Sequence, residues 1–234
     1  DGELFEADPP FELAVPGGNL TPLEDVAAYT KVYQFHGGHD GYAALIELIE
    51  EILQADDETF ATTLLTRFNV DALVAYAALM AVIQSQDHVK KNYYLYRDNS
   101  GPDCRWEMLP WDLDLTFGHL WTPDKGLLEE TLFTDGDPLV GRNNGTLFYN
   151  QLLDRLFKHP PWLAAYRGAI NKVLAGFTPT FVQQRAQQVV CQIGPDLLAD
   201  RNKRAKNAEL KARIDELFVF TKERAKFLKA WLKN

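Results

Sequence analysis

Asp87, Asn92, Asp112 and Asp114 are the residues of this chain whose types and spacing best suit chemistry. An Asp precedes an Asn by five residues, and a second acidic pair begins twenty residues after that Asn. Carboxylate and amide oxygens are ligands that magnesium prefers, and an Asp beside a hydroxyl group can accept its proton. Phosphoryl transfer in protein kinases uses these functions in the same order along the chain. The spacing therefore indicates a site for phosphoryl transfer.

Two predicted elements would position these residues. Residues 92–97 and 105–110 are strand-like, and the turn-forming run Asp-Asn-Ser-Gly-Pro-Asp at 98–103 joins them, which predicts a β-hairpin between Asn92 and Asp112. An apolar helix is predicted over Val70 to Gln86, with Asn69 as its N-cap. This helix would deliver Asp87 from its C-terminal end on a rigid support.

The whole segment from Asp87 to Gly118 carries a longer pattern. It reads Lys-Asn-Tyr-Tyr-Leu-Tyr at 91–96 and Pro-Trp-Asp-Leu-Asp-Leu-Thr-Phe-Gly at 110–118. This segment closely resembles the signature of the CotH (spore coat protein H) family of atypical protein kinases. Weaker resemblance includes Gly-Glu-Leu-Phe at 2–5, Asn-Gln-Leu-Leu at 150–153 and Asp-Arg-Asn-Lys at 200–203.

The resemblance implies an activity and its residues. Asp87 would be the catalytic Asp, and Asn92, Asp112 and Asp114 would be metal ligands. The cofactors would be ATP and Mg²⁺ or Mn²⁺, and the γ-phosphoryl group would pass to Ser or Thr of a spore coat or extracellular protein. That substrate class favours an exported, cell-surface or spore-coat location. Which of Asp112 and Asp114 is the main metal ligand stays open; two carboxylates so close in sequence would repel each other without a cation between them.

The expected fold is mainly α-helical, α+β overall. It would be a kinase-like C-terminal lobe with one small β-hairpin between the catalytic loop and the metal-binding Asp motif. We expect residues 1–234 to form one kinase-like domain, a fragment of a longer chain that lacks most of the N-terminal lobe. This expectation arises because a Gly-rich phosphate loop and a strand-borne phosphate-binding Lys are not recognisable before Asp87.

The rest of the chain reads as helices and loops. Residues 1–35 are expected to be irregular because Pro and Gly interrupt them. Residues 119–145 form an expected long loop, in the place of a kinase activation and substrate loop. Besides the helix before Asp87, helices are expected at Tyr42–Gln54, Asp57–Arg67, Thr146–His159, Pro161–Leu174, Pro179–Val190 and Asn202–Lys233.

Composition limits the function classes. The chain has a hydrophobic content of 46%, which argues against disorder, and it has no apolar run of about 18 residues that could span a membrane. Its net charge of −9 makes general nucleic-acid binding an unsuitable function. Residues 200–234 carry 11 Lys or Arg against five Asp or Glu, which we interpret as the solvated face of an amphipathic helix. Cys104 and Cys191 could form a disulfide or be two thiols.

Two other functions, a hydrolase and a binding scaffold, remain open. A polysaccharide hydrolase could use Asp87 with Asp112 or Asp114 as acid and base, and Trp106, Trp111 and Trp121 could stack on sugars. A non-catalytic scaffold could keep the kinase-like lobe for binding only. Asn92 favours the kinase over the hydrolase, because only the kinase gives this amide a metal-binding role. The oligomeric state is not indicated by the sequence.

Overall fold

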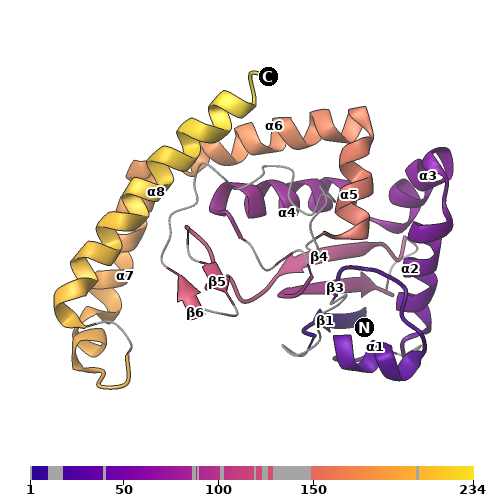
Figure 1. The fold of residues 1–234 in the computed structure, drawn as a ribbon, viewed down its shortest axis with the longest axis horizontal. Helices are drawn as coiled ribbons and strands as arrows, with labels where there is room; N and C mark the ends of the chain where they lie inside the picture. Colours follow the sequence, from indigo (N-terminus) through magenta and orange to yellow (C-terminus); the bar gives the residue numbers. More distant parts are fainter. Residues whose placement is uncertain are drawn as a thin grey trace.

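A four-stranded antiparallel sheet joins the N-terminal segment to the predicted hairpin (Figure 1). Its strands, in spatial order, are β2 (Tyr33–Phe35), β1 (Gly2–Ala7), β3 (Tyr93–Asp98) and β4 (Trp106–Pro110). The structure is a computed structural model, and it describes residues 2–9, 18–38, 41–85, 88, 90–100, 103–118, 120–122, 126–128, 149–203 and 206–234. The element order and the pairing of β3 with β4 confirm the predicted mainly helical α+β class and the predicted hairpin.

The prediction that residues 1–35 are irregular is wrong for residues 2–7 and 26–35, whereas residues 18–25 form no helix or strand and residues 10–17 lie outside the described part. Strand β1 occupies an inner position of the sheet and pairs with both β2 and β3, and helix α1 (Val26–Val32) precedes β2. The hydropathy pattern did not indicate the strand β1, because the charged residue Glu3 points inward and the apolar residue Leu4 points outward. Glu3 is fully buried and forms an ion pair with Arg97 at 2.7 Å, whereas Leu4 is only partly buried.

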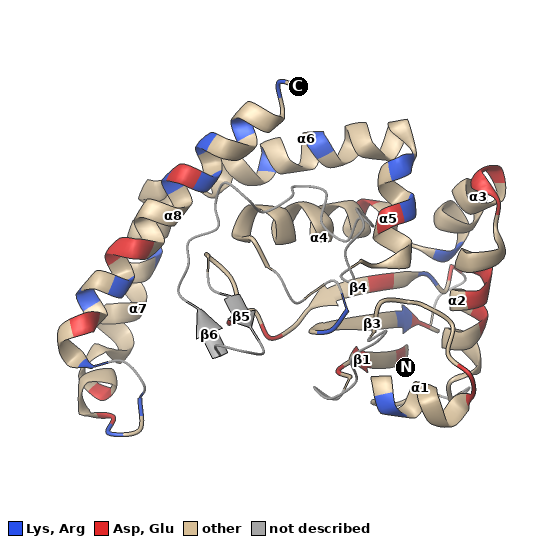
Figure 2. Ribbon diagram, in the orientation of Figure 1, with Lys and Arg blue, Asp and Glu red and all other residues tan. Residues whose placement is uncertain are grey.

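The helices before the site follow local sequence signals closely. They are α2 (Ala43–Gln54), α3 (Asp57–Arg67) and α4 (Val70–Ile83). Asp56 caps α3 by accepting from the Thr59 N–H at 2.8 Å, and Asn69 caps α4 by accepting from Ala72. Helix α4 carries one charged residue, Asp71, and is largely tan in Figure 2. An apolar helix of this kind is buried on most sides, and α4 lies between β4 and α6.

The second half of the chain adds further helices above and beside α4. They are α5 (Gln151–Lys158), α6 (Pro160–Gly176), α7 (Pro179–Ala199), the short 3₁₀ helix η2 (Asn207–Glu209) and α8 (Leu210–Trp231). The predicted end of α7 at Val190 is too early, because the helix continues through Pro195. A Pro inside a helix removes one hydrogen bond but does not always end the helix. Helices α7 and α8 lie side by side, on the opposite side of Figure 1 from α2 and α3.

Within the expected loop at 119–145, the structure describes a short antiparallel hairpin. Its strands are β5 (Leu120–Thr122) and β6 (Gly126–Leu128), so this part of the loop prediction is corrected; residues 129–148 lie outside the described part. Cys104 and Cys191 are exposed thiols and do not form a disulfide. Among the described residues, no helix is both long and apolar enough to cross a membrane.

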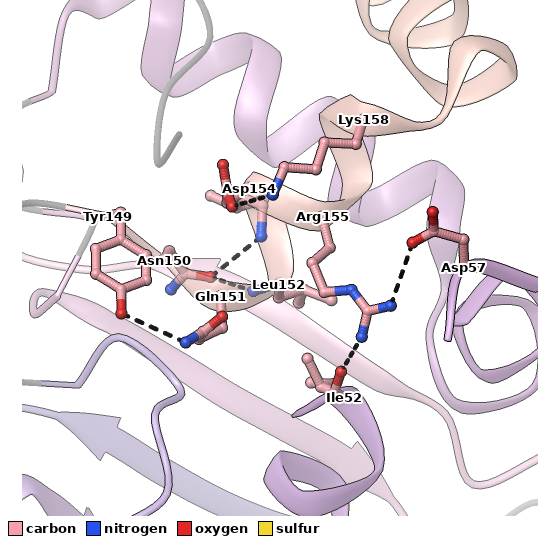
Figure 3. A network of polar contacts seen from close by, with 10 residues as sticks. Ile52, Asp57, Tyr149, Asn150, Gln151, Leu152, Asp154, Arg155 and Lys158 are labelled. Carbon is pink, nitrogen blue, oxygen red and sulfur yellow. Dashed lines mark hydrogen bonds and ion pairs between the residues drawn. The ribbon is translucent and has the colours of Figure 1, made fainter. Parts of the chain in front are cut away.

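A polar network ties α5 to α2 and α3 (Figure 3). Asn150 caps α5 by accepting from the backbone N–H groups of Leu152 and Leu153. The Arg155 guanidinium donates to the Ile52 carbonyl at the end of α2 and lies 3.6 Å from the Asp57 carboxylate. The network therefore fixes α5 against the helices that precede α4.

Candidate active site

Asn92 directly precedes β3, at the edge of the sheet where β1 and β4 end. Its backbone N–H donates to the Ala7 carbonyl at 2.8 Å, and its carbonyl accepts from the Trp111 N–H at 3.2 Å. The backbone has a φ of 61°, a left-handed conformation that Asn adopts more readily than most residues. Asn92 is thus held between the end of β1 and the end of β4. Its bonding partner Trp111 directly precedes Asp112 in the chain.

Asp112 and Asp114 leave β4 in a turn that brings their carboxyl groups together. Asp112 also has a left-handed backbone, with a φ of 46°. Its pKa is raised, first by partial removal of water from its carboxyl group and then by the charge and a side-chain hydrogen bond of Asp114; Lys91 opposes this rise. A raised carboxyl pKa means that the ionised form is disfavoured in the folded chain. Two such carboxylates are a suitable place for a cation.

The Asp motif is anchored to the end of α4. The Thr116 hydroxyl donates to the Leu113 carbonyl at 2.8 Å, which closes the turn, and the Phe117 N–H donates to the Ile83 carbonyl at 2.8 Å. The Phe117 ring lies against Phe177 and Phe220, with centroid distances of 6.1 and 5.7 Å. The turn that carries Asp112 and Asp114 therefore touches the last residue of the helix that leads to Asp87.

Arg224 of α8 binds the same end of α4, a role that no sequence pattern indicated. Its Nε and Nη2 donate to the Ala81 carbonyl at 3.0 and 2.7 Å, and the residue is 1% exposed. The interpretation of the charges of residues 200–234 as a solvated face is therefore wrong for Arg224. A cation at a helix C-terminus satisfies carbonyl groups that have no partner within the helix.

Not every expected site residue can be placed. Asp87 lies outside the residues that the structure describes, so its position relative to the other three stays a prediction. Asn92, Asp112 and Asp114 come together at one end of the hairpin. Of the three Trp residues considered for sugar stacking, Trp106 is fully buried and cannot serve, Trp111 is exposed, and the Trp121 side chain is not described.

The donor set fits a hard divalent cation. Across the described part of the chain, no group of three or more His, Cys, Asp or Glu side chains is arranged to hold a metal ion. A metal at this site would therefore depend on the two carboxylates together with a ligand of another type. Amide and carboxylate oxygens of Asn92, Asp112 and Asp114 match the oxygen ligands of Mg²⁺ and Mn²⁺.

His88 is buried directly beyond the end of α4. It is 1% exposed, and its ring meets the Tyr76 ring edge-on with a centroid distance of 6.1 Å. Burial lowers the pKa of His88 from 6.5 to about 4. A neutral buried imidazole next in sequence to Asp87 makes this part of the site sensitive to acid.

We expect His88 to make the chain less stable at acidic pH. The unfolded chain binds the proton at an ordinary pKa and the folded chain does not, so the stability present above pH 6.5 is lost as the pH falls toward 4. The loss should reach about 2 kcal/mol by pH 5. Urea unfolding of the wild type and His88→Phe between pH 7.5 and 5 would measure it. The variant should lose about that much less stability, and parallel curves would contradict the prediction.

Comparison with known proteins agrees with the motif. Residues 8–228 match the model of the family described as CotH kinase protein. Inner spore coat protein H of Bacillus subtilis (strain 168) is 23% identical over 186 residues, which is 79% of this chain and 47% of that protein. The chain thus spans about half the length of this curated relative. With most of its length matched by the family model, the chain belongs to the CotH kinase family.

Proposed function

We propose that this chain is the C-terminal-lobe part of a protein kinase that transfers the γ-phosphoryl group of ATP to Ser or Thr of a protein. The main support for this proposal is that Asn92, Asp112 and Asp114 lie at one end of the β3–β4 hairpin. The chain also belongs to the CotH kinase family. The name of the Bacillus subtilis relative associates that relative with the inner spore coat. A spore coat or other exported protein is accordingly the substrate class that we propose.

The four site residues divide two tasks in this proposal. Bound Mg²⁺–ATP would supply the phosphoryl group and neutralise the charge that develops on it. Asn92, Asp112 and Asp114 would hold the metal ion, and Asp87 would accept the proton of the acceptor hydroxyl group. The left-handed backbones of Asn92 and Asp112 are fixed by the sheet and the turn, which orients the ligands before metal binds.

The fragment interpretation also remains a proposal. Kinase catalysis depends mainly on positioning the nucleotide between two lobes. The described residues before α4 supply β1 and β2, which extend the hairpin sheet, and helices α1 to α3. We propose that a further N-terminal lobe closes over the nucleotide in the parent protein.

Divalent metal should stabilise the folded chain through Asp112 and Asp114. At Mg²⁺ ten times its Kd, the free energy of unfolding should rise by about 1.4 kcal/mol, or roughly 3–6 °C in Tm. Asp112→Asn with Asp114→Asn should remove this rise. Without metal, the same variant should be at least as stable as the wild type, because the raised pKa of Asp112 shows that its charge is unfavourable.

The control removes two carboxylates elsewhere. Asp215→Asn with Glu216→Gln on α8 affects two exposed residues that pair with Lys211 and Arg213. This variant should keep the full response of Tm to Mg²⁺. If the Asp112/Asp114 variant also kept it, the metal would bind elsewhere and the proposed metal site would be wrong.

A non-catalytic scaffold is the other outcome of these tests. It predicts binding without transfer, so a parent protein that binds Mg²⁺–ATP through these residues but phosphorylates nothing would support it. The polysaccharide hydrolase loses one of its three candidate sugar platforms with the burial of Trp106. No described feature favours it over the kinase.

A further inference from the structure

The residue before Asn92 is a lysine beside the candidate metal ligands. Sheet order and register place three chain segments in one row, because Ala7 pairs with Tyr93 and Tyr93 pairs with Pro110. Asp8 therefore follows the end of β1, Lys91 lies just before β3, and Asp112 lies just after β4. Three neighbouring strand ends bring a cation and two carboxylates to one edge of the sheet.

Contacts agree with this arrangement. The Lys91 ammonium lies 4.0 Å from the Asp8 carboxylate. Because Tyr93 pairs with Pro110, Asp112 lies just beyond the neighbouring strand end, two residues after β4 as Lys91 is two residues before β3. The cluster holds three carboxylates, those of Asp8, Asp112 and Asp114, and one ammonium group, that of Lys91, so its net charge is negative when all four groups are ionised.

The ion pair with Asp8 is a weak one. A separation of 4.0 Å is long, and the side chains of Lys91 and Asp8 are 31% and 44% exposed. Pairs of this kind contribute about 0–1 kcal/mol, so the ammonium group can exchange partners at little cost. When a divalent cation neutralises the carboxylates, the attraction that holds Lys91 toward them decreases.

We propose that Lys91 contacts the phosphate groups of the bound nucleotide, exchanging the Asp8 carboxylate for phosphate oxygens. This inference rests on the proposed function, since the phosphates arrive with the metal ion. An ammonium group has three N–H donors and binds phosphate as a point charge. The adjacent Asn92 is fixed by hydrogen bonds to β1 and β4, so the base of the lysine side chain is held next to the metal ligands.

Two readouts change in opposite directions when Lys91 is replaced. Lys91→Met keeps much of the length of the side chain and removes its charge. Affinity for Mg²⁺ alone should be equal to or higher than that of the wild type, because a cation next to the ligands is gone. Affinity for inorganic tripolyphosphate at saturating Mg²⁺ should fall about tenfold or more. A residue that only supported the fold would not separate the two.

Isothermal titration calorimetry of the 234-residue chain with Mg²⁺, and then with tripolyphosphate at saturating Mg²⁺, provides this test. Lys91→Arg should recover most of the phosphate affinity, and Lys222→Met, at an exposed lysine of α8, should behave as wild type. Equal tripolyphosphate affinity in the wild type and Lys91→Met, or no tripolyphosphate binding by a wild type that binds Mg²⁺, would overturn the role of Lys91 alone. Absence of Mg²⁺ binding by the wild type would instead overturn the proposed metal site, and the role of Lys91 with it.

Discussion

Replacing Arg97 by methionine should lower the free energy of unfolding by about 3–5 kcal/mol. The Arg97 guanidinium pairs at 2.7 Å with Glu3, which is fully buried on the inner face of the sheet, and lies over the Trp106 ring at 5.3 Å. Without Arg97, a buried carboxylate loses its partner inside the protein, which costs more than the pair itself contributes. Urea unfolding at pH 7 measures the loss.

Two further variants separate this mechanism from general damage. Glu3→Met together with Arg97→Met replaces both charges by apolar groups and should recover most of the lost stability. Arg67→Met removes another ion-paired arginine, but the side chains of its partners Glu47 and Glu51 are 58% and 36% exposed, so the cost should stay within about 1 kcal/mol. An Arg97→Met loss as small as that of Arg67→Met would contradict the buried-pair account.

Asp87→Ala in the parent protein should reduce phosphoryl transfer by about 10²–10⁴-fold. That is the range that a positioned general base contributes, and the proposed function gives this task to Asp87. Transfer from γ-labelled ATP to a Ser-rich protein, or to the parent itself, is the measurement. Asp71→Asn offers a control, because Asp71 is an exposed acidic residue at the other end of α4; it should leave transfer unchanged.

The same assay bears on the fragment proposal. The 234-residue chain alone should bind ATP weakly and transfer almost no phosphate, because half of the phosphate clamp would be missing. Robust ATP turnover by this chain that persisted in Asp87→Ala would overturn both the fragment interpretation and the role of Asp87.

Much of the scaffold followed from signals that are local in sequence. Helix α3 has the predicted bounds, because Asp56 supplies its N-cap and Arg67 lies in its last turn. The turn-forming run after β3 placed the hairpin correctly, and the hairpin in turn brings Asn92 to the exit of β4. A motif of this length constrains the local backbone strongly enough to be recognised without tertiary information.

What the sequence did not predict depends on contacts between distant segments. Strand β1 was missed because Glu3 faces the core, where it pairs with Arg97, 94 residues later in the chain. Arg224 has the spacing of an ordinary surface charge, but it reaches the end of α4 across 143 residues. The approach of Asp8 to Lys91 likewise required the position of β1 beside β3. Each case joins a polar residue to a partner that hydropathy patterns cannot indicate.

Mapping bound Mn²⁺ by NMR tests most directly the claim that Asn92, Asp112 and Asp114 form one metal site. The paramagnetic ion broadens amide signals most strongly where it lies closest. We expect the signals of Asn92 and of residues 112–115 to disappear first as Mn²⁺ is added, with and without ATP. Signals of α7, which lies well away from β3 and β4 in Figure 1, should persist longest. Broadening that begins at another surface, or that stays unchanged in the Asp112→Asn, Asp114→Asn variant, would contradict the account.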